Sequence, residues 1–233
     1  MTEKEIITTL ATIGVLTTLF FPVTLVLADS INPGVYSVDE KPFGSTYSHW
    51  TENFWKWMVS IPQENNPNLD STGEKCAINQ SDPNVWYLVP TFGGSAERTC
   101  NIPEGKAILI CILCGECSYA ENQELKSESE LRTCARQSND VGPRSMQAVV
   151  DGNNLKDLEK YRVESGLFDL TLPQNNVYSA PPGKTKSVSD GFWVFLEPLP
   201  VGAHDIEFSG SLIDPSGVGN YNTQVKYHLI VGK

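Results

Sequence analysis

Short runs of apolar and β-branched residues, separated by turn-forming residues, recur along most of the chain. They are VWYLVPTF (85–92), KAILICIL (106–113), SMQAVVDG (145–152), GLFDLTLP (166–173), GFWVFLEPL (191–199), AHDIEFSGS (203–211) and TQVKYHLIV (223–231). Some runs alternate apolar and polar positions, as half-buried strands do, and others are continuously apolar, as strands buried on both faces are. About seven such strands predict a mainly β protein, a single β-sandwich of the jelly-roll or immunoglobulin-like kind.

A helical pattern precedes these strands. Between 46 and 62 the chain reads TYSHWTENFWKWMVSIP, and its apolar residues recur every three or four positions. This spacing predicts an amphipathic helix over about 48–60. Ser48 is placed to cap the start of the helix and Pro62 to end it, and Trp55 falls outside the apolar stripe.

A capping-box sequence from Ser127 to Glu130 predicts a second short helix over 128–137, because each end residue can bond the backbone N–H of the other. The segment 155–161, LKDLEKY, predicts a helical turn. The expected architecture is therefore one β-sandwich domain, residues 46–233, with two or three short helices in its connections.

The N-terminal segment indicates the compartment. Residues 6–28 contain no charged side chain and are long enough to cross a bilayer as a hydrophobic helix. They end in Val26-Leu27-Ala28, which places small residues where signal peptidase requires them. We therefore predict a signal peptide or membrane anchor (1–28), a linker (29–45), and a domain outside the cytoplasm, either secreted or anchored.

The charge of the chain limits its partners. A formal net charge of −11 in 233 residues repels phosphate backbones, so we exclude nucleic acid as a partner. In an exported chain, the sequon Asn79-Gln80-Ser81 makes Asn79 a candidate glycosylation site.

Six cysteines, an even number, favour disulfides in an exported chain. Cys76 and Cys100 flank the strand predicted at 85–92. Cys117 and Cys134 bracket the excursion that contains the second helix. We therefore predict two bridges, Cys76–Cys100 and Cys117–Cys134.

The stretch CILCGEC (111–117) leaves Cys111 and Cys114 to be explained. In an extended strand their Cα atoms would lie about 10 Å apart, and a disulfide needs about 7 Å or less. A bridge between them therefore requires a break in the strand. Gly115 favours a turn over 114–117, which would also allow a tight Cys114–Cys117 pair. Three further states fit the same residues: a buried apolar thiol at Cys111, a third bridge after local bending, or a Cu or Zn site that uses both thiolates and a histidine. Apart from that metal site, we expect no cofactor.

Motifs of several enzyme classes are absent from the sequence, including His-Glu-x-x-His, Gly-x-Ser-x-Gly and the phosphate-binding loop. His204 sits among inward-facing strand positions and is expected to be a buried, hydrogen-bonded structural residue, whereas His228 is expected to point outward. A glycosidase would need a pair of carboxylates in one cleft. The candidates are Asp169, Asp190, Glu197, Asp205 and Glu207.

Several ordered blocks cover most of residues 45–231. They are WKWMVSIP, NPNLDSTGEKCA, VWYLVPTFGG, CNIPEGKAIL, ECSYAE, LEPLPVGAHDIEFSG and VKYHLIV. These blocks resemble a family of predicted exported bacterial and archaeal proteins that has no assigned activity. The resemblance implies an exported globular module and supplies no catalytic residue. Cys111 and Cys114 depart from the family pattern, which has an ordinary apolar strand at that place.

Together these features predict a structural or binding role at the cell surface. The expected partner is a cell-envelope polymer or another surface protein, and the expected contact residues are aromatic: Trp50, Trp55, Trp57 and Trp86. Two different functions stay open. One is an extracellular glycan hydrolase that uses paired carboxylates, and the second is a periplasmic soft-metal or redox protein built on CILCGEC. The motifs favour a non-enzymatic role.

Overall fold

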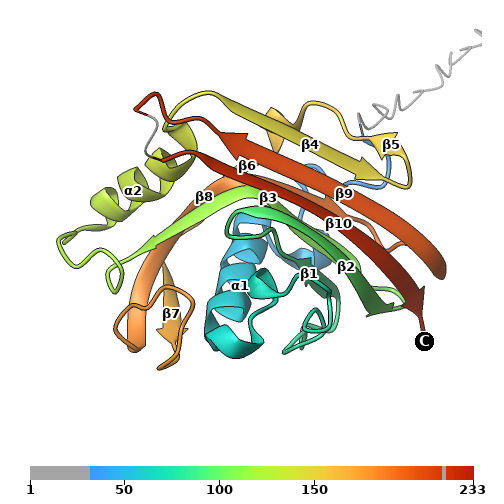
Figure 1. Ribbon diagram of the computed structural model, residues 1–233, viewed down its shortest axis with the longest axis horizontal. Helices are drawn as coiled ribbons and strands as arrows, with labels where there is room; N and C mark the ends of the chain where they lie inside the picture. Colours follow the sequence, from blue (N-terminus) through green and yellow to red (C-terminus); the bar gives the residue numbers. More distant parts are fainter. Residues whose placement is uncertain (1–31, 217–218) are drawn as a thin grey trace, which may run out of the picture.

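Two stacked β-sheets form the centre of the structure, and a helix covers the outer face of one of them, sheet A (Figure 1). The computed structural model describes residues 32–216 and 219–233. The prediction of a mainly β protein with two sheets is confirmed. The hydrophobic segment predicted at 1–28 lies outside the described residues. Within them, no helix is long and apolar enough to cross a membrane.

Sheet A has the strand order β1, β3, β8 and β6, and β7 also pairs with β8. Its strands are β1 (Val85–Leu88), β3 (Ala107–Ser118), β6 (Arg162–Glu164), β7 (Phe168–Leu172) and β8 (Gly183–Leu196). Sheet B has the order β2, β10, β9, β4 and β5. Its strands are β2 (Gly94–Pro103), β4 (Arg144–Val150), β5 (Asn153–Asn154), β9 (Gly202–Leu212) and β10 (Tyr221–Gly232). The β1–β3 and β2–β10 pairs are parallel, and the other pairs are antiparallel.

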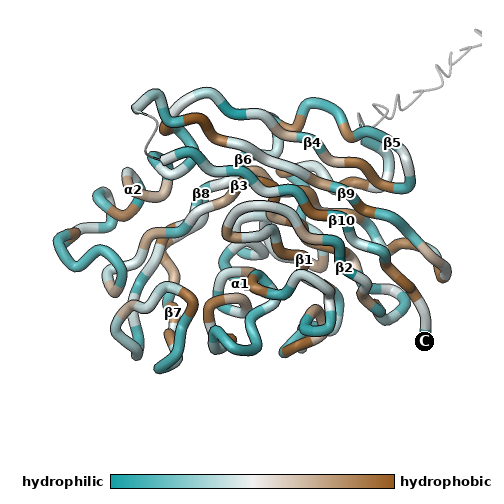
Figure 2. Tube along the Cα trace, viewed as in Figure 1, coloured by the Kyte–Doolittle hydropathy of each residue, from teal (hydrophilic) through white to brown (hydrophobic). Residues whose placement is uncertain are grey.

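Two α-helices and four short 3₁₀ helices connect the strands. They are α1 (Tyr47–Ser60), α2 (Glu128–Asp140) and the 3₁₀ helices Pro42–Gly44, Gln63–Asn65, Pro67–Leu69 and Leu158–Tyr161. Figure 2 shows apolar stretches along β9 and β10, whereas the loop before α2 is hydrophilic.

The position of β3 explains its continuous apolar run. Ile108 and Ile110 point into the core between the two sheets, whereas Leu109 and Cys111 belong to the cluster under α1. Because both faces of sheet A are covered, both sets of side chains must be apolar. The prediction of a strand buried on both faces is confirmed.

The first helix is found where its spacing predicts it, but two details differ. Its N-cap is Thr46, whose side chain accepts a hydrogen bond from the His49 backbone N–H at 3.2 Å. The prediction that Ser48 caps the helix is therefore wrong. Trp55, expected outside the apolar stripe, is 5% exposed, because it packs edge-on against Trp193 of β8.

The second helix follows the predicted capping box. Ser127 accepts from the Glu130 backbone N–H at 3.3 Å, and the Glu130 carboxylate accepts from the Ser127 N–H at 2.8 Å. Leu131 and Ala135 pack on Val188 of β8. Helix α2 therefore covers the far end of β3 and β8, on the left of Figure 1.

Two segments differ from the sequence-based expectation. The residues 32–45 were expected as a linker, but Val35 bridges Leu196 and is buried in the core between the sheets. The sequence pattern also does not predict β2. Its three inward positions are held by Arg98, Cys100 and Ile102, and a charged residue among them hides the alternation of a half-buried strand.

Candidate functional site

The cysteines form three disulfides. The predicted bridges Cys76–Cys100 and Cys117–Cys134 are confirmed, with Cα atoms 6.1 and 6.0 Å apart. Cys111 and Cys114 form the third bridge. Three disulfides fit an oxidising environment outside the cytoplasm.

The third bridge forms because β3 bends at Ile112. The register against β8 shifts between Cys111 and Leu113, so Ile112 is the extra residue of a β-bulge. The bulge brings the Cα atoms of the two cysteines to 5.9 Å, within reach of a disulfide. The turn predicted over 114–117 is wrong, since β3 continues to Ser118.

A metal site at CILCGEC would require free thiolates at Cys111 and Cys114. Both sulfur atoms are instead bonded to each other. Within residues 32–216 and 219–233, no three or more His, Cys, Asp or Glu side chains are grouped to hold a metal ion. In the disulfide form, these two cysteines are not metal ligands.

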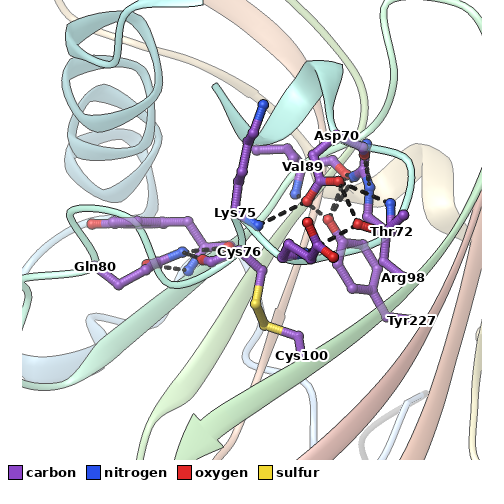
Figure 3. The surroundings of a disulfide bond; sticks show 11 residues. Asp70, Thr72, Lys75, Cys76, Gln80, Val89, Arg98, Cys100 and Tyr227 are labelled. Atoms are coloured by element: carbon purple, nitrogen blue, oxygen red, sulfur yellow. Dashed lines mark hydrogen bonds between the residues drawn. A yellow bond between two sulfur atoms is a disulfide. The ribbon is translucent and has the colours of Figure 1, made fainter. Parts of the chain in front are cut away.

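A buried polar cluster beside the Cys76–Cys100 bridge is centred on Arg98 (Figure 3). The Arg98 guanidinium donates to five oxygen atoms: the backbone carbonyls of Asn68, Asp70, Val89 and Pro90 and the hydroxyl of Tyr227. The Asp70 carboxylate accepts from the Thr72 backbone N–H at 2.9 Å. Because Arg98 is 1% exposed and bonded within the protein, this cluster fixes a loop against sheet B and is structural.

The predicted aromatic contact residues are not on the surface. Trp50, Trp55, Trp57 and Trp86 are 5%, 5%, 8% and 4% exposed. The first three pack in the cluster between α1 and sheet A, and Trp86 packs between the sheets. The prediction that these rings form an exposed contact surface is therefore wrong. Trp55 nevertheless lines a pocket.

This pocket, of about 280 Å³, opens at one end of the sandwich. It lies between α1, the loop after β1, the end of α2 and the connection from β9 to β10. Its wall includes the apolar and aromatic side chains of Phe54, Trp55, Phe92, Leu113, Leu212 and Tyr221. None of the described residues that line it is charged, which suits an apolar, uncharged group.

Two polar atoms of residues that line the pocket lack partners. The indole Nε1 of Trp55 and the amide Oδ1 of Asn68 are buried, and no hydrogen bond to either is formed within the described residues. Both side chains are less than a tenth exposed. A buried donor and a buried acceptor without partners are costly to stability.

Exposed apolar side chains surround the pocket opening and form what we call the apolar rim. Its members are Phe92, Val141 and Ile213, which are 47%, 37% and 55% exposed. Phe92 and Val141 line the pocket, and Ile213 follows Leu212, which also does. The sequence analysis missed this rim. The sequence run 85–92 was interpreted as one strand. In the structure β1 ends at Leu88, so Phe92 lies in a loop, where its side chain is exposed.

A second, polar groove of about 480 Å³ crosses the outer face of sheet B. It includes Glu97, Gln147, Glu207, Gln224 and Lys226, and the Lys226 ammonium pairs with Glu207 at 3.0 Å. The aromatic residue at this groove is Phe208, whose side chain is 2% exposed because it points into the core. The groove therefore has no ring on which a sugar could stack.

The five candidate glycosidase carboxylates do not share the polar groove: Glu207 lines it together with Glu97, and Asp169, Asp190, Glu197 and Asp205 do not. Four of them have separate basic partners: Asp169 pairs with Lys186, Asp190 with Arg162, Asp205 with His228 and Glu207 with Lys226. The first two lie on sheet A and the other two on sheet B.

The two strand histidines are bonded within the protein. The ring nitrogens of His204 lie 2.7 Å from the Asp151 carboxylate and 2.8 Å from a backbone carbonyl, so the predicted hydrogen bonding is found, but the residue is half-buried and not fully buried as expected. Burial lowers the pKa of His204, but these two bonds outweigh it and the pKa is raised. His228 points outward, as predicted, and its pKa is raised by the carboxylates of Glu97 and Asp205.

Glu116 is a buried acid that the sequence analysis did not single out. The Ser187 hydroxyl donates to its Oε2, and its Oε1 is buried without a hydrogen-bond partner. Burial, together with the neighbouring Glu121, holds the pKa of Glu116 well above its ordinary value. Tyr178 also faces this carboxyl group. The Glu116 carboxyl group is bonded within the protein, and we therefore regard it as structural.

Asn79 is exposed in the loop before β1 and has a left-handed backbone conformation with φ of 53°. The sequon is therefore open to solvent.

Comparisons with known proteins give little help. No protein-family model and no curated protein matches the chain. The crystal structure of the cysteine protease inhibitor EhICP2 from Entamoeba histolytica is 11% identical, with 64% of this chain and 95% of that chain covered and a TM-score of 0.23. The solution structure of amebosin is 12% identical, with 64% and 99% covered and a TM-score of 0.20. At these TM-scores, the likenesses carry no argument.

Proposed function

We propose that the protein is an extracytoplasmic binding module whose pocket receives an apolar side chain of a partner surface protein. The observation that supports this most is the pocket itself, which combines an aromatic, uncharged wall with an unpaired donor on Trp55 and an unpaired acceptor on Asn68. Export through residues 1–28 and glycosylation at Asn79 belong to the same proposal. The three disulfides support an oxidising compartment.

The size of the pocket and its surroundings favour a polypeptide over a small molecule. A volume of about 280 Å³ lies at or below the range of small-molecule sites, and it suits one side chain. The apolar rim extends the contact surface beyond the pocket. Large exposed apolar side chains grouped in this way are typical of protein contacts, in which one anchor side chain enters a pocket.

Side-chain mimics test the proposal directly. We expect N-acetyl-phenylalaninamide to shift the NMR resonance of the Trp55 indole N–H in a saturable way. At about 0.3 kcal/mol per non-hydrogen atom, a probe of about 15 such atoms binds with a Kd of roughly 1 mM. N-acetyl-glycinamide, which has no side chain, should leave the resonance unchanged at the same concentrations.

Two valines provide a matched pair of variants. Val141→Asp places a carboxylate at the pocket, and Val201→Asp places the same carboxylate at a valine that is 60% exposed in the loop before β9. Val141→Asp should weaken probe binding at least fivefold, and Val201→Asp should not change it. The proposal fails if no mimic shifts the Trp55 resonance, or if both variants weaken the probe equally.

A further inference from the structure

We infer that the Cys111–Cys114 disulfide is a thiol–disulfide exchange site that reacts with a cysteine thiol entering the pocket. The first support is its span. It joins residues 3 positions apart, whereas the other bridges join residues 17 and 24 positions apart. The stabilisation that a disulfide gives to a fold increases with the length of the loop that it closes. This bridge therefore adds the least to the fold of the three.

The surroundings of the two cysteines accommodate the reduced form as well. Strand β3 pairs with β8 on both sides of the bulge and with β1 before the bulge. Cys111 is completely buried in the apolar cluster under α1. A neutral thiol in such a place behaves as a small apolar residue. Opening the bridge therefore leaves no buried charge and breaks no strand pairing.

The two sulfur atoms differ in access. Cys114 is half-buried and lines the pocket, whereas Cys111 is 0% exposed. A thiolate that enters from the pocket therefore meets the Cys114 sulfur first. Attack at that sulfur makes Cys111 the leaving group.

The exchange balances with a thiol as the only co-reactant. The incoming thiol loses its proton to water, and its sulfur bonds to Cys114 while the Cys111–Cys114 bond breaks. Cys111 leaves with the electron pair and takes up one proton, equal in number to the proton that the incoming thiol gave up, so the step produces no net charge. A second thiol then attacks the mixed disulfide at the sulfur of the first thiol, and this releases Cys114 as a thiol. The two small thiols are oxidised to a disulfide, and the protein disulfide is reduced to a dithiol.

The order in which the bridges open tests the inference. The folded, oxidised protein would be incubated with N-acetylcysteinamide at increasing concentrations, then alkylated and mapped by mass spectrometry. We expect the Cys111–Cys114 bridge to open at a concentration at least tenfold below that needed for either of the longer-span bridges, with the mixed disulfide on Cys114. Opening of Cys117–Cys134 first, or opening of all three bridges together, would overturn the inference.

Single-cysteine variants give a second test that does not depend on the order in which the bridges open. In folded Cys111→Ser the remaining Cys114 thiol should react with the disulfide of N-acetylcysteinamide at least 100-fold faster than the Cys111 thiol of folded Cys114→Ser. Equal rates would overturn the inference. The mimic titration of the pocket uses oxidised protein and no thiol, so either proposal can fail while the other survives.

Discussion

At the scale of single residues, Arg98 joins three parts of the chain: the loop at Asp70, the segment after β1, and Tyr227 of β10. Arg98→Met keeps the length of the side chain but leaves buried oxygen atoms without donors. We expect it to lower the free energy of unfolding by about 3 kcal/mol or more, measured by urea denaturation. The control is Arg136→Met, since Arg136 is 58% exposed in its ion pair and its replacement should have little effect on the free energy of unfolding. Similar losses in both variants would contradict the structural role of Arg98.

Arg98 also shows why β2 could not be predicted from the sequence. A charged residue between apolar strand residues resembles a surface position, so β2 could not be recognised. The oxygen acceptors that make the burial of Arg98 favourable come from other segments of the chain. The alternation of apolar and polar residues along a strand does not indicate them. The tryptophans gave the opposite error. For Trp50, Trp55 and Trp57 the helical spacing was informative, but only the packing of α1 against sheet A shows that their rings are covered. Trp86, on β1, is covered between the two sheets.

Glu116 gives a prediction for the effect of pH. Its folded-state pKa is raised, mainly by burial, above the ordinary value of about 4.3 that holds in the unfolded chain. The folded state therefore keeps a proton that the unfolded state has lost, and stability falls as the pH rises above about 4.3. Glu116→Gln removes this loss. We expect the free energy of unfolding of the variant to exceed that of the wild type at pH 7 and to differ from it much less at pH 4, in urea denaturation at both values. The exposed Glu124→Gln serves as control, and a gain for Glu116→Gln that does not change with pH would refute the explanation.

At the scale of elements, the bulge in β3 depends on a glycine in β8. A Cβ atom added at Gly191 would lie 2.5 Å from the Cys114 Cβ and 2.6 Å from its Cα. We expect Gly191→Ala to lower the free energy of unfolding by about 2 kcal/mol or more, because backbone has to move. Gly232→Ala, where a Cβ meets open space, is the matched control in the same denaturation experiment. If both variants are equally stable, the backbone at the bulge shifts without cost, and the close approach of Gly191 to Cys114 does not contribute to stability.

Elements differ in how far the sequence could predict them. Local rules suffice for α2, whose cap and first turn lie within four residues, and for β10, whose alternate residues are buried. The bulge at Ile112 has no local signal, since an apolar run reads the same with or without an extra residue. The pocket is harder still to predict. Its wall comes from segments distant in sequence, and no local pattern shows that they lie side by side in the fold. The contact of the expected linker with the core was missed for the same reason. Val35 is one apolar residue, and its partner, Leu196, is distant in sequence.

At the scale of the whole molecule, sheet A couples the two cores. Alternate residues of β3 enter the cluster under α1 and the core between the sheets, so neither layer can loosen without exposing the other face of the same strand. The free energy of opening should therefore be the same on both sides. Phe54→Ala, which removes a 1% exposed ring from under α1, tests this. We expect hydrogen exchange to show a loss of about 3–5 kcal/mol at the slowest amides of α1 and an equal loss at those of β10. Unchanged protection in β10 would instead show that the two layers unfold separately.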